Sequence, residues 1–141
     1  MPVRVLFVCL GNICRSPAAE AAFAHLVTAA GLADDFVIDS AGTGNWHVGE
    51  AADERMRQAA STRGLAVTSI ARQVAAADFE QFDHILAMDR DNLRALTERA
   101  PARHQPKVRL FRDFDPEAPN AWCVVRDAQG ARHRESVSGS G

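Results

Sequence analysis

The feature that most constrains this chain is a short loop enclosed by Cys9 and Arg15, between an expected strand and an expected helix. Residues 3–8 read V-R-V-L-F-V, a β-branched and aromatic run typical of a buried strand. The loop continues as L-G-N-I-C-R, and we expect Ser16 and Pro17 to be the N-cap and first residue of the helix. A loop of successive backbone N–H groups that leads into a helix N-terminus is an arrangement that binds phosphate-like anions.

The residue types inside the loop suit a bound dianion. Gly11 permits a positive φ and Asn12 tolerates the left-handed region, so we expect the amides of residues 10–15 to turn inward. Arg15 can hold two oxygens of the anion in bidentate geometry, which a lysine cannot copy. The same positive field favours the thiolate form of Cys9, which is the form that attacks phosphorus.

The expected anion site is a continuous stretch of the chain. We expect Ser16 to donate a hydrogen bond to the Cys9 sulfur, which makes that sulfur a better leaving group when a phosphocysteine breaks down. Cysteine and arginine have this spacing by chance in about one case in twenty, so the prediction depends on the flanking strand and helix signals. The alternative is a buried cysteine that ends a core strand. The predicted phosphate-binding residues are Leu10, Gly11, Asn12, Ile13, Cys14, Arg15 and Ser16.

Length and charge narrow the class of protein. With 141 residues and 15.3 kDa, the chain has the size of one domain. With a net charge of -2, the chain lacks the excess of basic residues typical of a dedicated nucleic-acid or anionic-membrane binder, so we expect neither nucleic acid nor a membrane as a partner. The first ten residues are too short an apolar run to cross a bilayer and lack a secretory cleavage pattern, which favours a cytoplasmic location.

Strand and helix signals alternate along the chain, which predicts an α/β, three-layer doubly wound fold with a four-stranded parallel sheet. The Cys9 loop then lies at the C-terminal end of the first strand, where such folds bind ligands. The expected strands are Val3–Val8, Phe36–Asp39, His84–Met88 and Val108–Phe111. The expected helices run from Ser16 to a Gly31 cap, from Ala52 to Arg63, and from an Asp89 cap to Arg99.

Several longer motifs resemble the low-molecular-weight protein tyrosine phosphatases. They are V-C-L-G-N-I-C-R-S-P-A-A-E at Val8–Glu20, D-S-A-G-T-G-N-W-H-V-G at Asp39–Gly49, A-M-D-R-D-N-L at Ala87–Leu93 and D-F-D-P-E-A-P at Asp113–Pro119. The resemblance implies that residues 1–119 form the phosphatase domain, with Cys9 as nucleophile and Arg15 as the phosphate and transition-state ligand. It also implies that Asn12 holds the shape of the loop with Ser40 as a supporting partner, and that no metal or cofactor is needed.

Three further residues, Trp46, His47 and Cys14, keep two interpretations each, and a fourth, Asp89, is assigned a structural role. By the resemblance, Trp46 forms the aromatic wall of the substrate cleft; otherwise it is an ordinary exposed loop tryptophan. His47 either lines the same mouth or is a solvated loop histidine, and for Asp89 we favour a helix cap. The resemblance implies that Cys14 can form a reversible disulfide with Cys9, whereas the alternative is a small apolar filler.

Residues 120–141 depart from the family pattern. The family places its general acid in an Asp-Pro-aromatic motif, which this chain lacks; Asp127, followed by alanine, is the sole aspartate beyond Asp115. The closing amphipathic helix of the family also has no visible counterpart, so we expect a divergent, poorly ordered tail. A changed reading frame is one hypothesis for it. Apolar surface left open by a missing helix would favour self-association.

The resulting prediction is a phosphomonoester hydrolase that acts through a phosphocysteine, most of all on phosphotyrosine proteins or small aryl phosphates, with inorganic phosphate as product. Impaired turnover of unactivated substrates follows from the altered acid loop. One alternative is a non-catalytic phosphate- or phosphotyrosine-binding module. The other is an arsenate reductase, which needs additional cysteines, and beyond Cys9 the chain offers Cys14 and Cys123.

Overall fold

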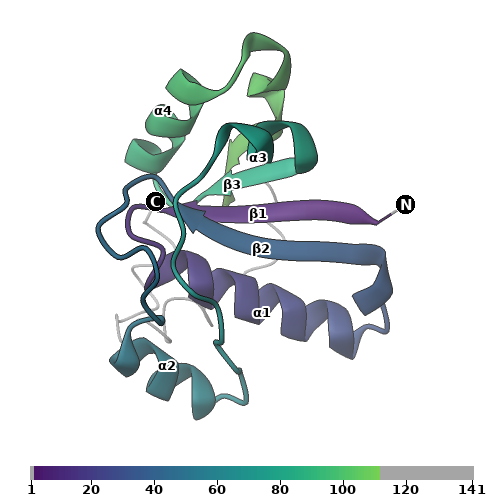
Figure 1. Ribbon diagram of the computed structural model, residues 1–141. Helices are drawn as coiled ribbons and strands as arrows, with labels where there is room; N and C mark the ends of the chain where they lie inside the picture. The colour runs from purple at the N-terminus through teal and green to yellow at the C-terminus, as the bar shows by residue number, and fades with distance from the viewer. Residues whose placement is uncertain (1, 112–141) are drawn as a thin grey trace.

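The computed structural model describes residues 2–111. Its sheet has four parallel strands in the order β2-β1-β3-β4, with helices on both faces (Figure 1). The predicted doubly wound α/β fold is therefore confirmed. The strands are β1 Val3–Cys9, β2 Phe36–Gly42, β3 His84–Ala87 and β4 Val108–Leu110. The helices are α1 Arg15–Ala29, α2 Glu54–Ser61, α3 Ala76–Gln81 and α4 Arg90–Arg99, with 3-10 turns at Ala33–Asp35 and Ala102–Lys107.

Alternate residues of β1 supply two separate hydrophobic cores. Val5, Phe7 and Cys9 face the core that contains residues of α1 and α2. Leu6 and Val8 face the opposite core, which contains residues of α3 and α4. A strand buried on both faces needs a continuous apolar run rather than an alternating one, which explains the sequence of β1.

The parallel register brings the ends of β1 and β2 together. Cys9 pairs with Gly42 at the last position of this strand pair. From β1 the chain moves through α1 to β2 on one side, whereas β3 lies on the other side of β1 (Figure 1). The carboxyl end of β1 is thus the switch point of the topology, and the loop after Cys9 lies there as predicted.

Two elements differ from the prediction. β2 continues through Ser40, Ala41 and Gly42, residues that sequence patterning had assigned to a loop. Pairing with β1 holds this polar, glycine-containing stretch in the sheet. Helix α3 was not predicted, because six residues are too few for an apolar period to show.

The start of α1 also differs. The helix begins at Arg15 with Cys14 in the N-cap position and no side-chain cap, so the prediction of Ser16 as N-cap and Pro17 as first residue is wrong. The reason is that tertiary partners occupy the Ser16 hydroxyl. The predicted end holds: Gly31 has a φ of 76°, and its N–H donates to the Thr28 carbonyl.

Helix α2 is shorter than predicted. It begins after Asp53, whose carboxylate accepts from the N–H of Met56, rather than at Ala52.

No helix within residues 2–111 is long and apolar enough to cross a membrane. The expectations about the tail, including Asp127, Cys123, the missing helix and self-association, lie outside the described residues and stay predictions.

Candidate active site

The sulfur of Cys9 lies at the base of the predicted loop, at the end of β1. Cys9 is 3% exposed, and its Sγ accepts from the backbone N–H of Ser16 at 3.4 Å. The Ser16 hydroxyl lies 3.0 Å from the same sulfur, so the predicted contact between them is present. No side chain caps α1, so its N-terminus, with the Arg15 N–H and the positive end of the helix dipole, stays open to an anion, while the Ser16 N–H already donates to the sulfur.

Asn12 is the structural centre of the loop. Its φ of 57° makes it the one non-glycine residue with a positive φ among residues 2–111, and it is 1% exposed. Gly11, in contrast, does not have a positive φ, so that part of the prediction is wrong. Gly11 instead lies close to the ring of His47: a Cβ there would be 3.0 Å from Cδ2 of His47, so the ring would have to shift by a few tenths of an ångström.

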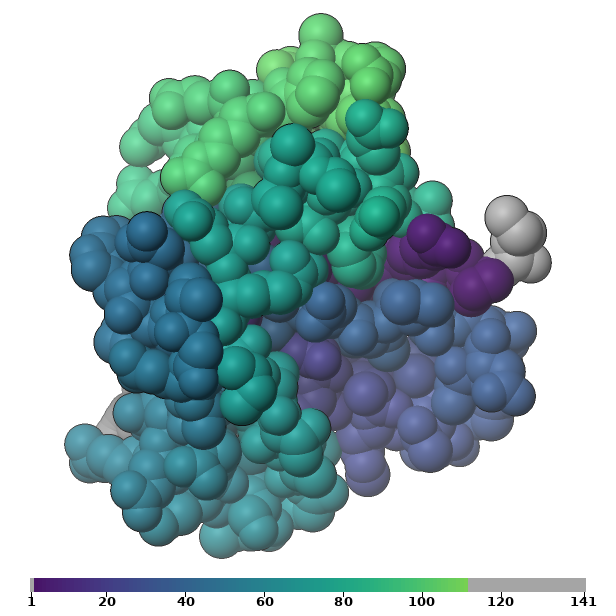
Figure 2. Space-filling view, viewed as in Figure 1, coloured from purple at the N-terminus to yellow at the C-terminus, as the bar shows by residue number. Residues whose placement is uncertain are grey.

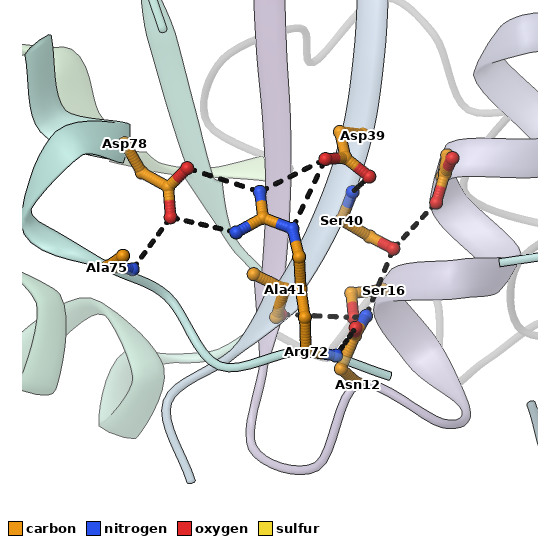
Figure 3. A network of polar contacts seen from close by, with 9 residues as sticks. Asn12, Ser16, Asp39, Ser40, Ala41, Arg72, Ala75 and Asp78 are labelled. Carbon is orange, nitrogen blue, oxygen red and sulfur yellow. Dashed lines mark hydrogen bonds and ion pairs between the residues drawn. The ribbon is translucent and has the colours of Figure 1, made fainter. Parts of the chain in front are cut away.

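The side chain of Asn12 fixes the direction of a chain of hydrogen bonds (Figure 3). Its Oδ1 accepts from the backbone N–H of Arg72 at 2.9 Å. The amide nitrogen must then be the donor to the hydroxyls of Ser16 and Ser40, at 2.8 and 3.0 Å. The hydroxyl hydrogen of Ser16 is left for the Cys9 sulfur at 3.0 Å or the Ala41 carbonyl at 3.4 Å.

Ser40 passes the chain of hydrogen bonds to Glu20 of α1. Ser40 is 2% exposed, and its hydroxyl donates to Oε1 of Glu20 at 2.6 Å. Burial raises the pKa of Glu20, and the neighbouring Asp39 carboxylate raises it further, while Ser40 and Arg72 act in the opposite direction. Glu20 was not predicted as a site residue, because it lies 20 positions from Ser40 in the sequence.

The side chain of Arg15, the first residue of α1, extends to the start of α4. Its Nη2 forms an ion pair with Oδ2 of Asp89 at 2.9 Å. Asp89 also caps α4, as predicted, because its Oδ1 accepts from the N–H of Asn92 at 2.8 Å. The ion pair was not predicted; it leaves other guanidinium nitrogens of Arg15 available to an anion.

A second loop, residues 43–51, lies against the first. The N–H groups of Thr43 and Gly44 donate to the carbonyls of Cys9 and Leu10, both at 2.9 Å. Gly42 permits this approach, because a Cβ there would lie 2.7 Å from the Leu10 oxygen. In the space-filling view the blue loop stands at one edge, beside the teal segment that includes residues 68–74 (Figure 2).

The second loop carries the predicted rim residues. Trp46 is 66% exposed, and its ring packs so closely on Gly44 that a Cβ there would overlap it. The Nδ1 of His47 lies 3.0 Å from Oε1 of Glu50, with the ring edge against Gly11. Leu10 is 52% exposed at the same mouth. His47 thus lies beside the loop that follows Cys9, while its role and that of Trp46 stay predictions.

Cys14 is half-buried inside the loop, and both it and Cys9 are free thiols. The pKa of the Cys14 thiol is raised from 9.0 to about 11, first by burial and then by the charges of Asp53 and Cys9, while Arg15 acts in the opposite direction. Cys14 is therefore protonated at neutral pH. A regulatory disulfide between the two cysteines stays a prediction. Among residues 2–111 no three His, Cys, Asp or Glu side chains are grouped as a metal site requires.

Comparison with known proteins identifies the family. The family model for low molecular weight phosphotyrosine protein phosphatase matches residues 4–135. A low molecular weight phosphotyrosine protein phosphatase of Schizosaccharomyces pombe is 47% identical over 126 residues, which cover 89% of this chain and 80% of the relative. The chain belongs to the low-molecular-weight phosphotyrosine protein phosphatase family. The predicted family and enzyme class, a protein-tyrosine phosphatase, are thus confirmed.

Solved structures of other phosphatases share the fold described above. A protein tyrosine phosphatase from Entamoeba histolytica superimposes with a TM-score of 0.80 at 39% identity, covering 90% of this chain and 92% of that chain. DARP, a drosophila arginine phosphatase, superimposes with a TM-score of 0.72 at 38% identity, covering 83% of this chain and 76% of that chain. The family match continues to residue 135, and the predicted domain boundary at residue 119 stays a prediction.

Proposed function

We propose that this phosphatase hydrolyses phosphotyrosine in proteins, and small aryl phosphates, through a phosphocysteine at Cys9. The observation that carries the proposal is the position of the Cys9 sulfur, which accepts from the Ser16 N–H at 3.4 Å at the uncapped N-terminus of α1. The amides of residues 10–16 and the free nitrogens of Arg15 are the proposed ligands of the phosphate oxygens.

In the first step the Cys9 sulfur attacks phosphorus, the S–P bond forms, and the P–O bond to the aryl group breaks. The electron pair leaves on the aryl oxygen, which then takes a proton. In the second step a water oxygen attacks phosphorus, and the S–P bond breaks with its electrons returning to sulfur. The Ser16 hydroxyl, 3.0 Å from Sγ, stabilises the departing thiolate, and inorganic phosphate is released with the proton of the water.

The source of the proton for the aryl oxygen separates two kinds of substrate. A nitrophenolate leaves without much protonation, whereas the phenolate of tyrosine requires an acid. We expect the altered acid segment to lower turnover of phosphotyrosine more than turnover of para-nitrophenyl phosphate. Equal, high rates on both substrates would contradict this expectation and indicate an intact general acid.

The test is a comparison of the wild-type protein with Cys9→Ser on para-nitrophenyl phosphate. We expect a burst of nitrophenol followed by steady turnover for the wild type and no turnover for Cys9→Ser, since the hydroxyl is a far weaker nucleophile. Unchanged activity of Cys9→Ser would overturn the proposal. Tight vanadate binding with no burst in the wild type would favour the non-catalytic binding module, and arsenate-dependent thiol oxidation would favour an arsenate reductase.

Phosphoarginine is a second candidate substrate, because DARP, an arginine phosphatase, is 38% identical to this chain. Phosphotyrosine and phosphoarginine peptides of the same sequence should be compared by kcat/KM. We expect the phosphotyrosine peptide to be preferred. A higher kcat/KM for the phosphoarginine peptide would transfer the proposal to a P–N bond, with the same Cys9 intermediate.

A further inference from the structure

Asn12 is held in its unusual conformation by a residue far away in the sequence. Its Oδ1 accepts from the backbone N–H of Arg72 at 2.9 Å, across 60 positions of the chain. A φ of 57° is rare for a residue other than glycine, so contacts around it must select this conformation. Since Asn12 lies inside the phosphate loop, the position of Arg72 bears directly on the loop.

The backbone around Arg72 extends the sheet beyond β2. The N–H of Gly42 donates to the Arg72 carbonyl and the N–H of Val74 donates to the Gly42 carbonyl, both at 2.8 Å. Gly42 and Gln73 form an isolated parallel bridge. The backbone of this short segment is therefore hydrogen-bonded to the end of β2, and its Arg72 N–H is hydrogen-bonded to the side chain of Asn12.

The Arg72 side chain anchors the segment on two elements of the fold. Its Nε and Nη2 donate to Oδ2 of Asp39 in β2, at 3.2 and 3.0 Å. Its Nη1 and Nη2 donate to Oδ2 and Oδ1 of Asp78 in α3, at 3.0 and 3.2 Å. Figure 3 shows the guanidinium between the two carboxylates.

The bridge is partly shielded from water. Asp78 is 5% exposed, and its carboxylate also accepts from the N–H of Ala75 at 2.7 Å. Burial lowers the pKa of the Arg72 guanidinium, but Asp78 and Asp39 together outweigh it, so that the pKa is raised and the group stays charged. A planar guanidinium can serve two carboxylates at once, whereas a lysine ammonium is a single point of charge.

We propose that Arg72 is a positioning residue of the phosphatase site, because the Asp39–Arg72–Asp78 bridge fixes the segment whose backbone holds Asn12. Arg72 has no contact with the Cys9 sulfur and acts through Asn12 on the geometry of the amides that bind phosphate. The inference rests on the proposed function. It assigns to Arg72 the support of phosphate binding and of turnover, beyond a general contribution to folding.

The test must separate positioning from stability, since Arg72→Met alone would leave the buried Asp78 carboxylate without its cation. The double variant Arg72→Met/Asp78→Asn removes both charges. Asp39 is 42% exposed at its side chain and can stay solvated. Arg103→Gln is the matched control, because it removes an arginine from an exposed pair with Glu80 at 3.3 Å.

For the double variant we expect kcat/KM on para-nitrophenyl phosphate to fall by about 10- to 100-fold, the scale of a misplaced catalytic group. The inhibition constant of inorganic phosphate should rise with it, while the melting temperature stays close to that of the wild type and Arg103→Gln is unchanged. A folded double variant with wild-type kcat/KM and phosphate inhibition would overturn the proposal. Arg72→Lys keeps a positive charge, so it should show a smaller decrease in kcat/KM and a smaller increase in the inhibition constant of phosphate. Wild-type values of both quantities for Arg72→Lys would also count against the proposal.

A double-mutant cycle tests the route through Asn12. Asn12→Gly deletes the side chain but tolerates a positive φ. We expect Arg72→Lys to lower kcat/KM in the wild type and to have little effect in Asn12→Gly, whereas additive losses would overturn the coupling. Retained turnover in Cys9→Ser would refute the proposed function itself, independently of the result for Arg72.

Discussion

Ser16 shows how one residue can serve a loop rather than the helix that contains it. Serine before proline usually indicates an N-cap, yet the Ser16 hydroxyl accepts from Asn12 at 2.8 Å and lies 3.0 Å from the Cys9 sulfur. Ser16 is fully buried, so no water competes for these contacts. The hydroxyl hydrogen of Ser16 has the Cys9 sulfur as its nearest acceptor, with the Ala41 carbonyl at 3.4 Å as the alternative, and in the proposed mechanism that sulfur is the atom that leaves phosphorus.

Ser16→Ala should slow the breakdown of the phosphocysteine. A hydrogen bond to a charged group contributes about 1.5–3 kcal/mol, which corresponds to a loss of roughly 10- to 100-fold in kcat. The burst of nitrophenol should persist, because the first step needs this contact less. Ser61→Ala, at an exposed position of α2, is the control and should keep the wild-type kcat; an unchanged kcat in Ser16→Ala would refute the assigned role.

The sequence predicted residues whose role shows in local pattern and missed those whose role comes from distant contacts. Cys9, Asn12 and Ser16 lie within one short motif, so their proximity follows from the chain itself. Arg72 and Glu20 have ordinary surroundings in the sequence, and their partners lie 60 and 20 positions away. No local signal could have paired them, because the fold alone brings them together.

At the scale of elements, the N-termini of α1 and α4 meet at the site. Helix α1 has no side-chain cap, whereas α4 is capped by Asp89, which also pairs with Arg15 at 2.9 Å. One carboxylate thus connects the end of β3 to the start of α1. Sequence predicted the cap, because Asp before a helical run is a local signal, but not the ion pair between two helices.

Two substitutions separate the functions of Asp89. Asparagine is as good an N-cap as aspartate, so Asp89→Asn should keep the stability of the protein and lose the ion pair with Arg15. Asp89→Ala should lose about 1 kcal/mol of unfolding free energy in addition. We expect both variants to bind phosphate roughly two- to fivefold more weakly, the scale of an exposed ion pair. The measurements are urea unfolding and phosphate inhibition; equal stability of the two variants would contradict the cap, and unchanged phosphate inhibition would contradict the ion pair's role.

The limits of helices and strands were predicted less well than their existence. Pairing with Cys9 extends β2 to Gly42, and such pairing is a property of the sheet rather than of the sequence S-A-G. Helix α3 is short, yet its Phe79 is 2% exposed and fills the second core. Tertiary contacts therefore decided what local propensity left open.

At the scale of the whole molecule, the order β2-β1-β3-β4 gathers the site at one edge of the sheet. This topology could be predicted, because alternating strands and helices restrict the choices to few. The same fold buries Glu20 beside Ser40 and Asp39, so the site and the stability of the fold share one ionisable group.

Glu20→Gln should change the dependence of stability on pH. Burial raises the pKa of Glu20 above 4.5, so its contribution to stability is fully present below pH 4.5 and is lost as the pH rises through the folded-state pKa. The glutamine keeps an acceptor for Ser40 and cannot ionise. We expect the unfolding free energy of the wild type, relative to Glu20→Gln, to decrease as the pH rises from 4.5 toward neutral pH.

Urea unfolding of both proteins across this pH range gives the comparison. Glu98→Gln, at an exposed position of α4, is the control and should follow the wild type at every pH. A difference between wild type and Glu20→Gln that stays constant with pH, or that changes in the opposite direction, would contradict the assigned burial of Glu20.

The central claim is that the sulfur of Cys9 forms the covalent intermediate. Its most direct test is mass spectrometry of the protein quenched in acid during turnover of para-nitrophenyl phosphate, followed by digestion and sequencing of the modified peptide. We predict one phosphoryl group, bound to Cys9 and absent from Cys14. A phosphoryl group on another residue, or none during confirmed turnover by the wild type, would contradict the account.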